Sequence, residues 1–283
     1  MAAETAPLED SNHRFFVDLA RAFGGAILFS FPILMTMEMW RLGSSISGSR
    51  LALLIALTIP LLYGLSYYDG FEDTHGAIDD IRETLIAYAV GFTASALMLV
   101  LFGVIKFEMT ADEIIGKISL QAVTASLGAM LAQSLLVVDK KTEEKAEERK
   151  RSASYRGQLF LMAVGAVFLC MSVAPTEEMV LISFQMTDWH SIALALLSLL
   201  IMHSFIYAVE SSGHENALSP GAPIWSIFLR YTVVGYAMVL LISFYVLWTF
   251  GSLDGMAFAE QLKATVVLGV PAAIGASASR LIL

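Results

Sequence analysis

Apolar runs of about 20 residues recur along the chain, separated by shorter polar stretches. Each run is continuous rather than alternating. Each could cross a hydrocarbon core about 30 Å thick as a helix that rises about 1.5 Å per residue. Transmembrane strands would instead alternate apolar and polar residues. The pattern therefore predicts an all-α fold, a polytopic transmembrane helical bundle of about eight spans. The predicted spans are residues 17–40, 50–68, 80–105, 114–138, 157–183, 189–209, 225–250 and 262–282.

Polar segments divide these spans into two groups of four. Residues 1–14 form a polar N-terminal tail, and residues 139–156 (DKKTEEKAEERKRSASYR) form an almost wholly charged segment. We expect the charged segment to be a solvated linker. It separates a first four-span unit, residues 15–138, from a second one, residues 157–283.

Composition narrows the class of protein. The chain is 57% hydrophobic and only 15% charged, whereas soluble domains carry roughly 25% charged residues. The net charge of −9 says little about nucleic acid by itself, but no basic patch points to a nucleic-acid partner, and none is predicted. The single cysteine, Cys170, excludes an intrachain disulfide. The expected partner is the lipid bilayer, no cofactor is predicted, and homo-oligomerisation stays open.

Lysine and arginine set the predicted orientation. If the linker is cytoplasmic, 12 of the 17 Lys and Arg residues fall on the cytoplasmic side and 5 on the other. Cytoplasmic loops are enriched in these residues. The distribution predicts a multi-pass protein with both termini in the cytoplasm. The first apolar run is too long for a cleavable signal peptide and is taken as the first span.

The two groups of spans resemble each other. GAILFSFPILMTMEM in the first span aligns without gaps with GAVFLCMSVAPTEEM in the fifth, at an offset of 140 residues. Thr36 then falls on Thr176, and Glu38 on Glu178. RETLIAYAV aligns with RYTVVGYAM at an offset of 148, and LGAMLAQSLL with IGASASRLIL at 147. These pairs predict two parallel four-span repeats, related by an axis along the membrane normal.

The repeated glutamates are the main candidate functional residues. An ionised carboxylate inside a span costs at least about 2.5–3.5 kcal/mol, which usually indicates a cation, a proton or a buried partner. Glu38 and Glu178 are therefore candidates for an outward-facing ion or proton site. Two further roles stay open for them. One is an interfacial carboxylate, with Trp40 as an aromatic anchor and Arg41 pairing with Glu38. The second is a hydrogen bond between helices.

Prolines lie near both glutamates. The apolar run from 157 to 186 would be about 45 Å long as a helix, and Pro175 should kink or break it. A broken helix exposes carbonyl groups, which together with Thr176, Glu177 and Glu178 would form an oxygen-rich site. Hard cations favour such ligands. The identity of any metal stays unknown.

The first half offers a similar arrangement on a smaller scale. Pro32 could loosen the middle of the first span, as Pro175 does in the fifth. Thr36 would then assist Glu38, as Thr176 would assist Glu178.

A weaker candidate is the predicted cytoplasmic segment DGFEDTHGAIDDIRE. Its acidic cluster consists of Asp69, Glu72, Asp73, Asp79 and Asp80. A solvated loop is the plainest interpretation. Negative charge also suits the first turn of a helix, and a metal or regulatory site remains an alternative. The spacing of an EF-hand calcium loop is absent.

The chain contains no HExxH motif, nucleophile elbow, phosphate loop or dinucleotide fingerprint. We therefore predict no catalytic residues and no enzyme activity.

The stretch RAFGGAILFSFPILMTMEMWRLG, together with YYDGFED, resembles a bacterial family of integral membrane proteins catalogued as a domain of unknown function. The resemblance implies a multi-span bacterial membrane protein. It implies no activity, substrate or site residue.

We therefore predict a cation transporter or channel, for a divalent metal or coupled to protons. Glu38 and Glu178 would carry the ion or proton, assisted by Glu177, Thr36 and Thr176. The alternative is a non-transporting membrane scaffold or stress-related accessory protein that acts through its linker and cytoplasmic loops.

Overall fold

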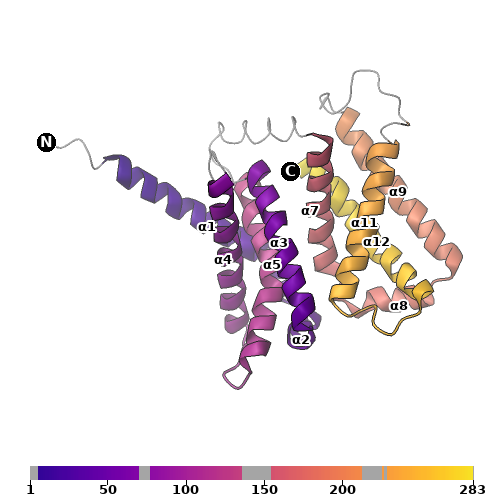
Figure 1. Cartoon of the computed structure of the whole chain (residues 1–283), viewed down its shortest axis with the longest axis horizontal. Coiled ribbons are helices and arrows are strands. Elements are labelled where there is room, and N and C mark those ends of the chain that lie inside the picture. The colour runs from indigo at the N-terminus through magenta and orange to yellow at the C-terminus, as the bar shows by residue number, and fades with distance from the viewer. Residues whose placement is uncertain (1–5, 70–76, 136–153, 212–224, 226–227, 283) are drawn as a thin grey trace.

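The computed structural model describes residues 6–69, 77–135, 154–211, 225 and 228–282. Every regular element among them is a helix. Eight of these helices are long and apolar enough to cross a membrane. They run side by side as a bundle (Figure 1). The predicted all-α transmembrane fold is confirmed.

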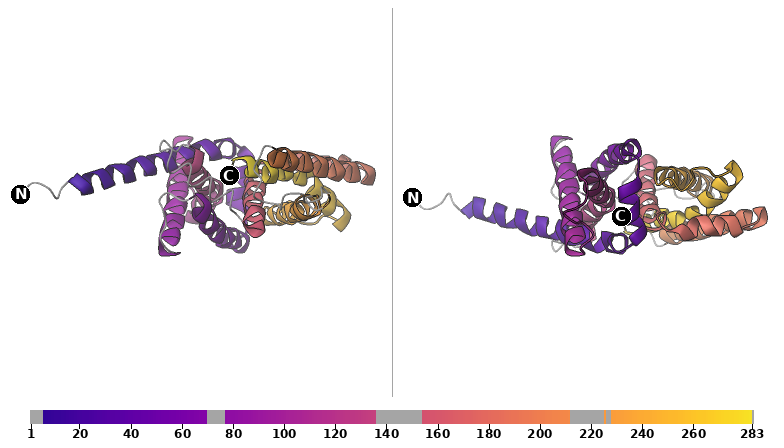
Figure 2. Two further views of the ribbon diagram at one scale, coloured as in Figure 1. Left: turned by 90° about the horizontal axis from the view of Figure 1, so that it is seen from above. Right: turned by 90° about the horizontal axis from the view of Figure 1, so that it is seen from below.

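The helices fall into two neighbouring groups (Figures 1 and 2). The first group contains α1 (Ala6–Leu34), α2 (Met37–Ser45), α3 (Gly48–Asp69), α4 (Ala77–Leu101) and α5 (Ala111–Leu135). The second contains α7 (Tyr155–Val173), α8 (Glu177–Gln185), α9 (Asp188–Ser211), the π-helical turn η1 (Phe228–Val233), α11 (Val234–Thr249) and α12 (Phe258–Ile282). Each group thus has one short helix after its first span. The proposed sequence repeat itself stays a prediction.

Small residues let the first and last helices of each group pack closely. A Cβ atom added at Gly25 of α1 would collide with the side chain of Ala132 and lie 2.8 Å from the carbonyl oxygen of Gly128 on α5. A Cβ at Gly165 of α7 would likewise collide with the carbonyl oxygen of Gly275 on α12. Close backbone approach at small residues is a common way for helices to associate in membranes.

The first and fifth spans are shorter than the sequence indicated. We predicted spans over 17–40 and 157–183, the second kinked or broken at Pro175, but α1 ends at Leu34 and α7 at Val173, just before Pro175. Thr36 and Thr176 adopt extended backbone conformations that interrupt the helices. The chain then turns into the short helices α2 and α8, which lie at the same end of the bundle, opposite the C-terminus (Figure 1).

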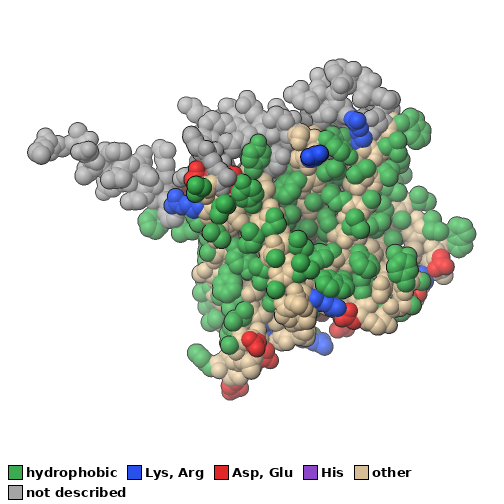
Figure 3. Space-filling model, viewed as in Figure 1, with side chains coloured by type: hydrophobic (Ala, Val, Ile, Leu, Met, Phe, Trp, Pro, Cys, Tyr) green, Lys and Arg blue, Asp and Glu red, His purple; other side chains and the backbone are tan. Residues whose placement is uncertain are grey.

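The surface agrees with a bilayer environment. Hydrophobic side chains cover the middle of the face drawn in Figure 3, whereas charged side chains gather towards its two ends. In α9 and α3 only a small share of the candidate span is buried, while in α5 nearly all of it is buried. Because hydrocarbon is as apolar as a leucine side chain, such exposure is expected for helices that face lipid.

Candidate functional site

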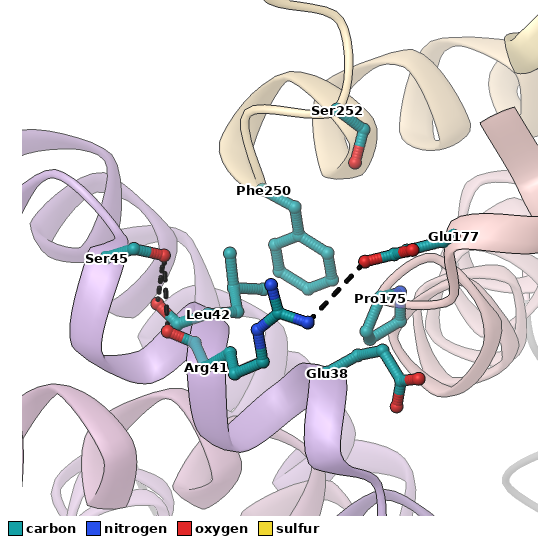
Figure 4. Close-up of a pocket in the computed structure, with 8 residues that line it drawn as sticks. All are labelled: Glu38, Arg41, Leu42, Ser45, Pro175, Glu177, Phe250 and Ser252. Carbon is teal, nitrogen blue, oxygen red and sulfur yellow. Dashed lines mark hydrogen bonds and ion pairs between the residues drawn. The ribbon is translucent and has the colours of Figure 1, made fainter.

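A pocket of about 180 Å³ lies between the two groups of helices, at the end of the bundle that carries α2 and α8. Its walls come from α2, from the start of α8 and from the connection between α11 and α12 (Figure 4). The lining residues are Glu38, Arg41, Leu42, Ser45, Pro175, Glu177, Phe250 and Ser252. The pocket therefore contains candidate residues from both halves.

The two helix breaks bring these residues to the pocket. Pro32 lies inside α1, and the helix continues for two more residues before the break. Pro175 lies in the second break itself, between α7 and α8. Glu38 and Glu177 then fall in the first turns of α2 and α8. The partial positive charge of a helix N-terminus favours carboxylates there.

The threonines of the breaks have a local role. The Thr36 hydroxyl donates to the carbonyl oxygen of Ile33 at 2.9 Å, and the Thr176 hydroxyl donates to that of Val173 at the same distance. Each of these carbonyls lies at a helix end and also accepts the backbone N–H of the same threonine, at 3.1 Å. Neither threonine lines the pocket.

Arg41 contacts Glu177 rather than Glu38. Its guanidinium nitrogen lies 3.7 Å from the Glu177 carboxylate, and the two side chains are 68% and 81% exposed. This distance is too long for a hydrogen bond, and exposed pairs of this kind contribute little to stability. The suggested pairing of Arg41 with Glu38 does not occur. In Figure 4 the Glu38 carboxylate points away from the guanidinium, on the side of Pro175.

Glu38 is consequently a carboxylate without a partner. It is half-buried and has no hydrogen bond or ion pair to any residue that the structure describes. Glu178 is exposed and is not among the lining residues, although it is adjacent to Glu177 in the first turn of α8. The pocket thus brings together Glu38 and Glu177, not the pair of glutamates that align in sequence.

A bidentate ion pair beside the pocket was not expected. Both terminal nitrogens of Arg50, in the first turn of α3, donate to the Asp254 carboxylate at 2.8 Å. The guanidinium also lies 4.9 Å from the ring centre of Trp248. Gly251 (φ +77°) forms the loop beside the pair, where a Cβ would lie 3.3 Å from both charged groups. The hydrogen bonds from Arg50 lower the pKa of Asp254 below its usual range.

Two lysines hold the short helices in place. The Lys117 ammonium group, on α5, donates to the carbonyl oxygen of Trp40 at 2.5 Å. The Lys263 ammonium group, on α12, donates to the carbonyl oxygen of Met186 at 3.2 Å and pairs with Glu260 and Asp188. In the sequence these lysines resemble ordinary interfacial residues, because no local pattern identifies a carbonyl partner 77 positions away.

The residues of the acidic cluster do not form one site in the described part of the chain. Glu72, Asp73 and the side chain of Asp69 lie outside the described residues. Asp79 is exposed, whereas Asp80 is 6% exposed. The Ser66 hydroxyl lies 3.5 Å from Asp80 and donates to Glu83 at 2.6 Å. Among the described residues, no group of three or more His, Cys, Asp or Glu side chains could hold a metal ion.

Comparison with known proteins supports the membrane class. A family described as "Putative integral membrane protein (DUF2391)" matches residues 18–283. No curated protein and no solved structure matches the chain.

Proposed function

The chain belongs to this family of integral membrane proteins, and on that premise we propose that it is a transporter or channel for a cation, either a divalent metal or one coupled to protons. We place it in a bacterial inner membrane with both termini in the cytoplasm, so that the pocket opens to the outside. We propose no catalytic role.

The observation that carries this proposal is the unpaired carboxylate of Glu38. A half-buried carboxylate that lacks a partner is stabilised when a cation binds it. Glu177 contributes a second carboxylate from the other half of the chain. Its contact with Arg41 is long enough to exchange when a cation arrives. The sequence alignment predicts that Glu178 carries the ion or proton together with Glu38. The Glu178→Gln variant described below tests this prediction.

The test is ion flux into liposomes that contain purified protein, with Ca²⁺, Mg²⁺, Mn²⁺, K⁺, Na⁺ and H⁺ as separate probes. We expect Glu38→Gln to lower the flux of the transported ion at least about tenfold, because a charge-assisted contact worth about 1.5–3 kcal/mol is lost. Glu108→Gln is the matched control: it removes an exposed carboxylate that lies outside the pocket lining.

Glu178→Gln separates the two arrangements of carboxylates. A loss equal to that of Glu38→Gln would support paired, repeat-related glutamates. Unchanged flux would restrict the site to the pocket. If folded wild-type protein moves none of these ions over a range of pH and voltage, the transport proposal fails.

One observation favours the alternative of a scaffold or stress-related accessory protein. Met39, Ala174, Met179 and Phe250, which lie in the sequence beside or among the pocket residues, belong to one buried apolar cluster. Transport would require this cluster to open. Absence of flux, together with a protein partner that is lost when residues 139–156 are replaced by a neutral linker, would favour the scaffold.

A further inference from the structure

Each half of the bundle is tied together by contacts of its own. In the first half, α1 to α5, the backbones of α1 and α5 approach closely at Gly25, and the Lys117 ammonium group ties α2 to α5. In the second half, α7 to α12, the backbones of α7 and α12 approach closely at Gly165, and the Lys263 ammonium group ties the end of α8 to α12. Close-packed contacts of this kind deform little. We therefore expect each short helix to move together with its own half.

Polar contacts join the two halves at the pocket end of the bundle. Arg50 of α3 donates two hydrogen bonds to Asp254, in the connection between α11 and α12, and also lies over the Trp248 ring of α11. Arg41 of α2 makes the longer contact with Glu177 of α8. Among the ion pairs that the described residues form, only these two join the halves. In both of them the first half supplies the guanidinium and the second half supplies the carboxylate.

Apolar contacts join the halves further from the pocket. Gly64 lies about 20 Å beyond Arg50 along α3, at about 1.5 Å per residue. The Phe160 ring of α7 packs against this glycine, where an added Cβ would lie 2.5 Å from the ring. The rings of Phe29 on α1 and Phe168 on α7 meet edge to face, with their centres 5.9 Å apart. Because apolar packing is non-directional, these rings can tilt against their neighbours without breaking a hydrogen bond.

The pocket adjoins an apolar cluster to which both halves contribute. Phe250 lines the pocket and belongs to this cluster, together with Met39 from the first half and Ala174 from the second. A cation that leaves Glu38 for the interior of the bundle meets these apolar side chains, which offer it no ligands. The ion can pass only if the two halves separate here.

We propose that the Arg50–Asp254 pair is a latch that holds the two halves together at the pocket end, and that the halves pivot about the contact of Phe160 with Gly64 when the latch opens. Opening parts the shared apolar cluster and extends the pocket into the bundle. Rocking of one half against the other is a common way for transporters to admit an ion. This inference concerns the regulation of the proposed transport site and rests on that function, whereas the opening itself can be measured without transport.

The test is the distance between the halves, measured by double electron–electron resonance on the full chain in nanodiscs. Spin labels at Ser44→Cys on α2 and Gln185→Cys on α8 report across the halves. Labels at Ser44→Cys and Ala111→Cys, at the start of α5, report within the first half. All three positions are exposed, and the native Cys170 is buried, so labelling is specific.

We expect Arg50→Gln and Asp254→Asn each to add a longer distance across the halves and to leave the distance within the first half unchanged. The charge swap Arg50→Asp with Asp254→Arg should restore the wild-type distances, because it restores an ion pair between the halves. Lys106→Gln is the matched control: it removes an exposed charge outside the pocket lining and should alter neither distance.

Cross-linking tests whether the latch controls transport. Arg50→Cys with Asp254→Cys, joined by a short bis-methanethiosulfonate linker, should lose ion flux in liposomes. A reducing agent that removes the linker should return the flux. Equal flux before and after cross-linking would overturn the link between the latch and transport.

The latch itself is overturned if neither single variant lengthens the distance across the halves. If the distance within the first half changes as well, the charge swap decides: restored distances support the latch, and unrestored distances overturn it. Longer distances in the single variants of a protein whose wild type carries no ion would reject transport and keep the latch. Flux in the wild type, with unchanged distances in both single variants, would keep transport and reject the latch.

Discussion

Arg50 and Asp254 show how single residues connect the two halves of the chain. They are 204 residues apart, yet they form two hydrogen bonds of 2.8 Å at the edge of the pocket. The ion pair lowers the pKa of Asp254 in the folded protein. The contribution of the pair to stability is therefore complete above the ordinary carboxylate pKa of about 3.9. It is lost as the pH falls through the lower pKa of the folded protein. We expect Asp254→Asn to lower the unfolding midpoint modestly at pH 7, with the difference from wild type vanishing in strong acid.

Thermal unfolding in detergent from pH 7 to well below pH 3 measures this effect. Glu108→Gln serves as the control and should give parallel curves. A difference between Asp254→Asn and wild type that stays constant over the whole pH range would contradict the ion-pair interpretation.

The same residues show what the sequence could and could not predict. Each span can be predicted from the length of its apolar run, because that length depends only on consecutive residues. Nothing local links Arg50 to Asp254, or Arg41 to Glu177, because the approach of the two halves decides these contacts. Glu38, a candidate from the sequence, lines the pocket, and its role stays a prediction. The sequence alignment pointed to Glu178, whereas the start of α8 places its neighbour Glu177 in the pocket.

At the scale of helices, the adjacent glycines of α1 provide a matched pair. A Cβ at Gly24 meets nothing within 4 Å, whereas a Cβ at Gly25 collides with Ala132 on α5. We expect Gly25→Ala to destabilise the protein by about 1–3 kcal/mol, because α1 and α5 must move apart. Gly24→Ala should be neutral or slightly stabilising, since alanine favours the helix. Unfolding in mixed micelles measures both, and equal stability of the two variants would contradict the close packing of α1 on α5.

The breaks after the first and fifth spans also belong to this scale. We expected Pro175 to kink or break its helix and Pro32 to loosen the first span, but in α1 the helical bonding passes beyond Pro32: the Met35 amide still donates to the Phe31 carbonyl oxygen at 3.2 Å. The helix ends only where Thr36 turns extended and the Trp40 indole donates to the Leu34 carbonyl oxygen at 2.7 Å. The end of α1 therefore coincides with this hydrogen bond from Trp40, six residues further along the chain, and not with Pro32. The sequence placed the end of the first span at residue 40, six residues beyond Leu34, where α1 ends.

At the scale of the whole molecule, the orientation in the membrane decides what the pocket can bind. The excess of Lys and Arg on the linker side, 12 of 17, predicts that the end bearing α2 and α8 faces out of the cell.

Cys170, the one cysteine of the chain, is buried, so a new cysteine can be labelled against a low background. Ser45 is exposed and lines the pocket. We expect Ser45→Cys to react with a membrane-impermeant maleimide on intact spheroplasts, and the unsubstituted chain to remain unlabelled. Labelling of Ser45→Cys only after the membrane is permeabilised would place the pocket on the cytoplasmic side and reverse the predicted orientation.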